Sequence, residues 1–159
     1  MNNAGVALDT DLVNGDTQKW KQVLDTNVLG LCIATREAIK IMRKNNIDGH
    51  IVHINSVTGH KIPRVVKLNV YAAAKYAVTA LTETLRQELN SVGSKIKVSS
   101  VSPGFVDTDM VKEEEALQGL EFVPILLPED VAQAVLYVLG TPPHVQVHEL
   151  MIRPIGEMA

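Results

Sequence analysis

A tyrosine and a lysine one helical turn apart, Tyr71 and Lys75, are the side chains with the clearest potential for acid–base chemistry. In a helix, positions i and i+4 lie on one face, so the phenol and the ammonium can lie close together. A free tyrosine has a pKa of about 10, and a neighbouring cation favours the phenolate. Such a pair can supply or remove a proton while a hydride moves. Alternatively, both residues simply begin a helix, with Tyr71 packed and Lys75 in solvent.

A serine and an asparagine could extend this pair. Ser56 follows a short β-branched run, and open α/β sheets place their sites at the carboxyl ends of strands. Its hydroxyl could bond a substrate carbonyl, or it could be a turn serine that bonds its own backbone. Asn27 interrupts an apolar helical pattern, although asparagine is a poor helix former. It could bind backbone groups and an ordered water, or it could hold a half-exposed position.

Two short segments with small residues could admit a flat ligand close to the backbone, because glycine and alanine leave room there. One segment begins the chain, and the other follows a predicted strand. Their residues are Asn2, Asn3, Ala4, Gly5, Pro103, Gly104, Phe105, Val106, Asp107 and Thr108.

Alternating patterns of helix and strand would position all of these residues. Apolar residues recur at three- and four-residue steps over 17–45, 71–92 and 128–140, which predicts three helices. Runs rich in β-branched residues at 50–55, 95–102 and 145–152 predict three strands. A loop is expected over 58–69. This order is typical of a parallel sheet with crossover helices, so we expect one α/β domain over residues 1–159.

Composition excludes several classes of protein. The 159 residues carry a net charge of -3, which argues against nucleic acid as a partner. One cysteine, Cys32, excludes an internal disulfide framework, and no apolar run approaches the roughly 20 residues of a membrane span. No metal site is expected, because His50 and His53 on a strand would point to opposite faces. The first residues do not resemble a secretory signal, so a cytoplasmic location is expected.

The features together resemble the short-chain dehydrogenase/reductase family over the whole chain. The resemblance rests on Asn-Asn-Ala-Gly, a mid-helix asparagine, a strand ending in serine, Tyr-x-x-x-Lys and Pro-Gly-x-Val-x-Thr in that order. The segments 56–60, 76–82 and 141–144 are similar to a subgroup that contains insect farnesol dehydrogenases and mammalian ketosteroid-reducing relatives. The family implies a Rossmann-like, doubly wound parallel sheet.

The resemblance also implies roles for individual residues. Tyr71 would be the catalytic acid/base, with Ser56 orienting the carbonyl or alcohol. Lys75 would bind the nicotinamide ribose and lower the pKa of the tyrosine, and Asn27 would hold a water in a proton relay. The segment from Asn2 to Gly5 would lie beside the adenosine half of NADP, with NAD not excluded. The other loop, from Pro103 to Thr108, would contact the nicotinamide half.

The substrate would be a small alcohol or carbonyl compound, such as a terpenoid alcohol like farnesol or a steroid. The expectation comes from an apolar stretch that would form a lid over 111–128. Its apolar residues are Leu117, Leu120, Phe122, Val123, Ile125 and Leu126. The alternative is that these side chains only pack the lid.

The 159 residues contain no glycine-rich turn of the Gly-x-x-x-Gly-x-Gly type, which holds the cofactor phosphates in this family. We therefore expect a partial fold that lacks its N-terminal strands, and a first strand whose outer edge nothing in the chain covers. An alternative function follows: a catalytically inactive module that pairs with itself or a relative. The two long helices, through which the family commonly dimerises, would form that contact.

Overall fold

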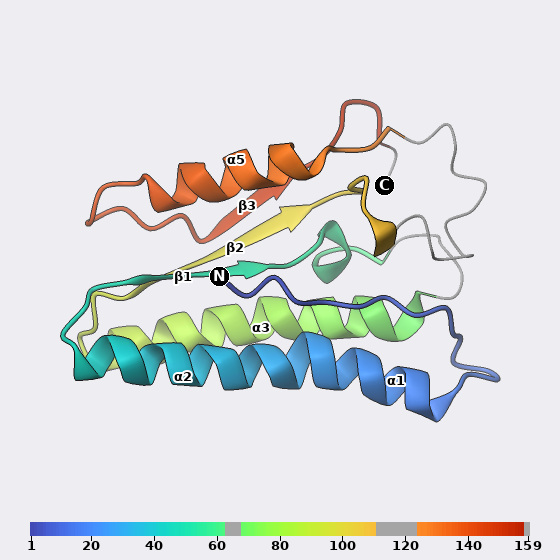
Figure 1. The fold of residues 1–159 in the computed structure, drawn as a ribbon, viewed down its shortest axis with the longest axis horizontal. Helices are drawn as coiled ribbons and strands as arrows, with labels where there is room; N and C mark the ends of the chain where they lie inside the picture. Colours follow the sequence, from blue (N-terminus) through green and yellow to red (C-terminus); the bar gives the residue numbers. More distant parts are fainter. Residues whose placement is uncertain (63–67, 111–123, 158–159) are drawn as a thin grey trace.

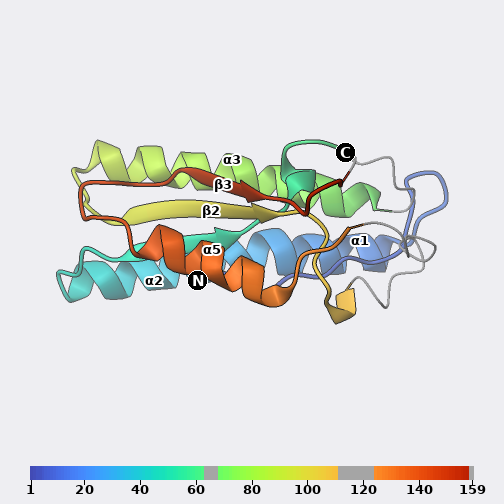
Figure 2. The same cartoon turned by 90° about the horizontal axis from the view of Figure 1, so that it is seen from above.

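The computed structural model describes residues 1–62, 68–110 and 124–157, which form three layers (Figure 1). A three-stranded parallel sheet lies between two helical layers, with α1, α2 and α3 on one face and α5 on the other (Figures 1 and 2). The α/β prediction is therefore confirmed. The strands are β1 (His50–Ile54), β2 (Lys97–Pro103) and β3 (Glu149–Ile152), and the helices are α1 (Thr17–Leu24), α2 (Leu31–Lys44), α3 (Asn69–Ser91) and α5 (Pro128–Leu139).

The central strand, β2, pairs in parallel with β1 on one side and β3 on the other. Val98 lies opposite Ile51, and Val101 lies opposite Leu150. From Val98 onward every residue of β2 is buried, because helices cover both faces of the sheet. Since all three strands run in the same direction, their carboxyl ends meet at one edge of the sheet, where such folds bind ligands.

The outer edge of β1 is partly covered, contrary to the expectation that nothing in the chain covers it. The amide of Asn2 donates to Val52 O at 2.8 Å, and the amide of Ile54 donates to Asn2 O at 2.9 Å. These bonds form a single parallel bridge between Asn2 and His53. The first residues of the chain therefore take the place of the end of a neighbouring strand.

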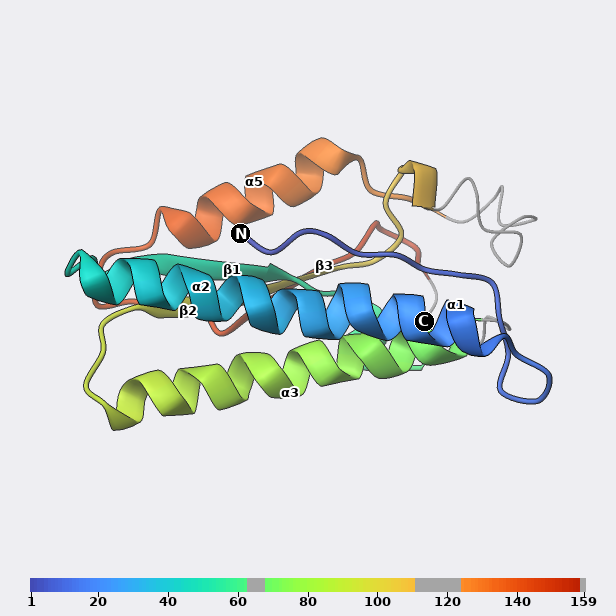
Figure 3. The same ribbon diagram turned by 60° about the horizontal axis from the view of Figure 1, so that its bottom comes forward.

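The first predicted helix, 17–45, forms one long rod in which α1 passes into α2 through a π-helical segment, η1 (Asp25–Gly30) (Figure 3). Asp16 caps its start by accepting a hydrogen bond from the amide of Gln18 at 2.7 Å. Asn27 lies within η1. Single π-helical turns are rare in proteins, and those that occur are often found at functional sites. Hydrophobic periodicity does not predict them.

The last strand is shorter than predicted, because side chains replace its expected ladder bonds. Gln146 Oε1 accepts from the amide of Val98 at 2.9 Å, and the Ser99 hydroxyl donates to Val147 O at 2.6 Å. Residues 145–148 therefore follow β2 without forming a regular strand, and β3 begins only at Glu149.

The hydrophobic core includes one cluster on each face of the sheet. On one face Ile51 and Val98 pack with Leu85 and Leu89 of α3. The members of the cluster on the other face are Val52, Val101, Ala134 and Val138. Within residues 1–62, 68–110 and 124–157, no helix is both long and apolar enough to cross a membrane.

A buried histidine connects the N-terminal segment to both helices beneath the sheet. His53 Nε2 lies 3.1 Å from Thr35 Oγ1, and its Nδ1 lies 2.8 Å from Thr82 Oγ1. Thr82 donates its own proton to Val78 O at 2.7 Å, so it must accept from His53 Nδ1–H. His53 Nε2 then accepts the hydroxyl proton of Thr35, whose oxygen accepts from Asn2 Nδ2 at 2.8 Å. This chain of bonds requires the neutral imidazole.

Acid is therefore expected to destabilise the fold through His53. Burial, helped by the nearby N-terminal amine and Arg86, lowers the pKa of His53 from 6.5 to about 4. Between these values the unfolded chain binds a proton that the folded chain does not, so stability falls as pH falls from 6.5 to about 4. The loss is about 3 kcal/mol. Urea unfolding across this pH range should show the loss of stability in the wild type and not in His53→Gln. Equal slopes of the free energy of unfolding against pH in the two proteins would contradict the attribution to His53.

Candidate active site

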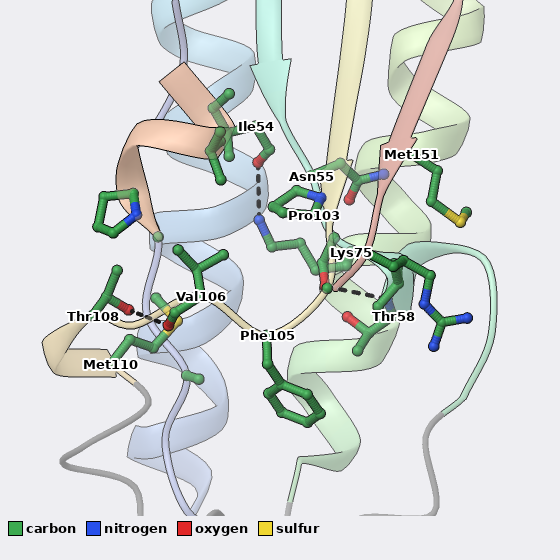
Figure 4. A pocket seen from close by; sticks show the side chains of 18 of the residues that line it. Ile54, Asn55, Thr58, Lys75, Pro103, Phe105, Val106, Thr108, Met110 and Met151 are labelled. Atoms are coloured by element: carbon green, nitrogen blue, oxygen red, sulfur yellow. Dashed lines mark hydrogen bonds between the residues drawn. The ribbon is translucent and has the colours of Figure 1, made fainter. Parts of the chain in front are cut away.

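A cavity of about 1550 Å³ opens at the carboxyl edge of the sheet (Figure 4). The ends of β1 and β2, the start of α3 and the N-terminal segment all contribute to its lining. This volume exceeds the roughly 300–1000 Å³ of an ordinary small-molecule pocket. The cavity therefore has room for a large ligand or for two ligands side by side.

Ser56 lies in the cavity wall, where β1 ends and a short 3-10 helix, η2 (Val57–Gly59), begins. Its backbone is extended, and its Oγ caps η2 by accepting from the amide of Thr58 at 3.1 Å. Because this amide occupies a lone pair of Oγ, the hydroxyl proton of Ser56 is free to point elsewhere. A side-chain hydrogen bond joins Ser56 to Tyr71.

Tyr71 and Lys75 lie in the first turns of α3 and both line the cavity. The lysine Nζ lies 5.6 Å from the centre of the tyrosine ring, and it donates to Ile54 O at 3.0 Å (Figure 4). Lys75 is only 6% exposed, so its ammonium is held inside the protein rather than in solvent. The structure thus brings together three of the four residues predicted to be catalytic.

The expected lowering of the tyrosine pKa is not present in the protein alone. Burial raises the pKa of Tyr71 to about 12, and the hydrogen bond from Ser56 opposes this rise only in part. Burial also lowers the pKa of Lys75 to about 8. Desolvation is therefore the main cause of both pKa shifts. At neutral pH the tyrosine keeps its proton and is poised to act as an acid.

Asn27, the fourth predicted catalytic residue, does not line the cavity. Its Oδ1 accepts from the amide of Val6, and its Nδ2 donates to Val6 O, both at 2.8 Å. Its side chain therefore positions the N-terminal segment against η1. The water relay expected of it stays a prediction.

Replacing Asn27 should loosen this segment. Asn27→Leu would leave both backbone groups of Val6 without a partner, at a cost of about 1–3 kcal/mol in stability. Asn27→Asp keeps the acceptor but loses the donor, so its loss should be intermediate. Urea unfolding and hydrogen exchange at the Val6 amide measure the effect. An unchanged exchange rate in Asn27→Leu would refute the positioning role.

The N-terminal segment contributes unequally to the cavity. Asn3 and Gly5 line it, whereas Asn2 and Ala4 do not. Asn2 instead donates to Thr35 and bridges to β1, so it fixes the segment in place. Gly5 lies against Asn27, whose Oδ1 is 3.5 Å from the position of a Cβ there.

The segment after β2 lines the cavity with the four residues predicted to do so: Pro103, Gly104, Val106 and Thr108. The Thr108 hydroxyl donates to Val106 O at 3.4 Å (Figure 4), and Val106 forms an isolated bridge with Leu126. Of the predicted lid, residues 111–123 lie outside the described part of the chain. Ile125 and Leu126 are described, and Leu126 is half-buried.

Several lining residues were missed by the sequence analysis. Two are Asn55 and Thr58, which flank Ser56 and carry buried oxygen atoms without a partner among the described residues. Others are His60, Met110, Met151, Arg153 and Glu157. Those after β3 could have been expected, since β3 ends at the same edge of the sheet as β1 and β2. Among the described residues, no group of three or more His, Cys, Asp or Glu could hold a metal.

Comparison with known proteins agrees with this geometry. The family profile described as short chain dehydrogenase matches residues 1–119. The chain belongs to the short-chain dehydrogenase family. Over 158 residues it is 52% identical to the farnesol dehydrogenase of Aedes aegypti, covering 99% of this chain and 63% of the relative. The chain thus spans less than two thirds of the length of this relative.

Solved structures show the same relation between fold and length. The closed form of serine dehydrogenase, complexed with NADP+, superposes with a TM-score of 0.88 at 30% identity, over 99% of this chain and 65% of that one. A 4-hydroxyisoleucine dehydrogenase mutant complexed with NADH and succinate superposes with a TM-score of 0.82 at 26% identity. The match covers 96% of this chain and 65% of that one. The chain therefore has a partial Rossmann-like fold of this family. One of these two structural relatives is complexed with NADP+ and the other with NADH.

Proposed function

We propose that this chain carries the reaction centre of a nicotinamide-dependent oxidoreductase that reduces a carbonyl compound to an alcohol. The observation that carries this proposal is the convergence of Ser56, Tyr71 and Lys75 on one wall of a large cavity at the carboxyl edge of the sheet. The family to which the chain belongs supports the same class of reaction.

The residues fit a nicotinamide cofactor at this edge. Gly5 leaves the backbone accessible in the cavity wall, and Lys75 offers a buried cation near the reacting groups. NADP is the proposed cofactor, with NAD not excluded. When bound, the nicotinamide would supply a hydride to the carbonyl carbon.

The side chains of this chain would supply the rest of the reaction. Tyr71 donates its phenolic proton to the carbonyl oxygen as this atom gains negative charge, and Ser56 donates a hydrogen bond to the same oxygen. The ammonium of Lys75 stabilises the phenolate that remains. Because burial raises the pKa of Tyr71 to about 12, the phenol carries its proton at neutral pH and can donate it to the carbonyl oxygen.

The proposed substrate is apolar, such as a terpenoid aldehyde or a steroid ketone. Leu68, Phe105, Met110 and Met151 give the cavity apolar walls. The farnesol dehydrogenase of Aedes aegypti, a relative at 52% identity, is named for a substrate of this kind.

The test is consumption of NADPH by the purified chain in the presence of an apolar aldehyde or ketone. We expect turnover that requires a high NADPH concentration, because the 159 residues contain no glycine-rich phosphate loop. No NADPH consumption at any concentration would refute the activity for this chain.

A second function is favoured by a row of exposed apolar side chains. Leu24, Leu29, Ile33 and Ile41, from α1 through α2, are all more than 40% exposed. Such a surface is typical of a contact between proteins, and a module that pairs with itself or a longer relative would use it. Sedimentation of the chain alone and with a longer relative tests this. A monomer in both experiments refutes it.

A further inference from the structure

Arg153 and Glu157, a charged pair that follows β3 in the chain, form part of the cavity wall. After Ile152 the chain makes a turn in which the amide of Glu157 donates to Pro154 O at 3.3 Å, with Gly156 at a φ of 88°. A positive φ at this turn position favours glycine. The turn brings Glu157 into contact with Arg153, whose Nη2 donates to Glu157 Oε1 at 3.0 Å.

The Glu157 carboxylate occupies the space that Gly104 leaves open. The amide of Gly104 donates to Ile152 O at 2.9 Å, which holds the loop after β2 beside the end of β3. A Cβ at position 104 would overlap Glu157 Oε2. Gly104, Arg153 and Glu157 all line the cavity. The carboxylate therefore lies in the wall of the same cavity as Tyr71.

Two polar atoms of this pair are buried and have no partner in the described part of the chain. They are Glu157 Oε2 and Arg153 Nε. The Glu157 side chain is 3% exposed, and no described residue supplies the missing bond. Buried polar groups are almost always satisfied, and a buried carboxylate oxygen without a donor is costly. A ligand that donates a hydrogen bond would remove this cost.

The position of the pair points to the substrate rather than to the cofactor. Gly156 faces Pro124, whose Cγ lies 3.6 Å from a Cβ built at Gly156, and Pro124 belongs to the segment predicted to form the substrate lid. Other lining residues, Ile62, Phe105 and Met151, are apolar. A molecule that fills this region would be apolar along its length and polar at its end.

We propose that Glu157, held by Arg153, is a second polar anchor for the substrate. This inference rests on the proposed function, and it narrows the substrate class to apolar carbonyl compounds or alcohols that carry a second hydroxyl group. One oxygen of the substrate lies at Ser56 and Tyr71, and the second hydroxyl donates its proton to Glu157 Oε2. A substrate with a single oxygen leaves the carboxylate unsatisfied.

Two probes of equal chain length test the anchor: decanol and the corresponding α,ω-diol. Binding to the full chain can be measured by NMR titration, with the amides of Gly104 and Gly156 as reporters. We expect the diol to bind about tenfold more tightly than the alcohol, which is what one hydrogen bond to a charged group can contribute. Glu157→Ala should lose this preference for the diol over the alcohol.

Two variants make the result specific. Glu157→Gln keeps an amide oxygen in place and should retain part of the preference. Glu37→Ala removes an exposed carboxylate on α2, paired with Arg36 and Lys40 away from the cavity, and should retain all of it. Equal affinity of the wild type for both probes, or a preference that survives in Glu157→Ala, overturns the anchor but leaves the proposed function standing. Binding of neither probe also overturns the anchor, whereas the proposed function is tested separately by NADPH consumption.

Discussion

Tyr71→Phe is expected to lower the rate of carbonyl reduction by a factor of about 10²–10⁴, which is the usual contribution of a positioned general acid. The substitution removes only the phenolic oxygen, so the ring keeps its packing against Ala7 and Leu68. Ser56 remains to orient the carbonyl, and the affinity for substrate should change little. The loss should therefore fall on kcat rather than on KM.

Tyr76→Phe is the matched control for this prediction. Tyr76 lies on the same helix, is 41% exposed and does not line the cavity. Its variant should keep the wild-type rate. Rates of NADPH oxidation, with circular dichroism to confirm folding, check both variants. A Tyr71→Phe variant that folds and turns over as the wild type does would mean that another group supplies the proton.

Lys75→Met is expected to change stability and activity in opposite directions. Burial lowers the pKa of Lys75 from 10.5 to about 8 in the folded protein. Between these values the unfolded chain binds a proton that the folded chain does not, so the free energy of unfolding of the wild type rises with pH. The rise between pH 8 and 10.5 is about 3 kcal/mol. Below pH 8 the ammonium of Lys75 is charged in the folded protein, and the full free-energy cost of burying this charge lowers the stability.

The methionine variant has no charge to bury, so its stability should lack this rise. It does lose the bond to Ile54 O, which offsets part of the gain at neutral pH by about 1–3 kcal/mol. Its turnover should fall strongly, since nothing then stabilises the phenolate of Tyr71. Urea unfolding of both proteins between pH 7 and 11 gives the two slopes. Parallel slopes would show that Lys75 is not the titrating group.

Local patterns in the sequence predicted the elements but not their irregular parts. The i and i+4 spacing of Tyr71 and Lys75 predicted their common face, and a strand ending at Ser56 predicted its place at the sheet edge. The π-helical segment around Asn27 was not predictable, because nothing in the hydrophobic period marks it. The shortening of β3 depends on bonds from Gln146 and Ser99 that only the folded chain reveals.

The lowering of the pKa of Tyr71 by Lys75 stays a prediction, because the protein alone shows the effect of burial and not that of a bound cofactor. The attraction of a cation for a phenolate competes with the cost of burying both groups, and the sequence carries no measure of burial. In the fold, burial acts on Tyr71 and Lys75 together and raises one pKa while it lowers the other. Glu157 was missed for a related reason, since its contact with Gly104 joins segments far apart in the sequence.

Transfer of deuterium from the cofactor tests the central proposal most directly. The chain would be incubated with an apolar ketone and NADPH that carries deuterium at the transferable C4 position, and the product would be analysed by mass spectrometry. We predict an alcohol with deuterium on its carbinol carbon, formed by the wild type and Tyr76→Phe and about 10²–10⁴ times more slowly by Tyr71→Phe. An alcohol without deuterium, or no alcohol at any cofactor concentration, would contradict a hydride-transfer site at Ser56, Tyr71 and Lys75.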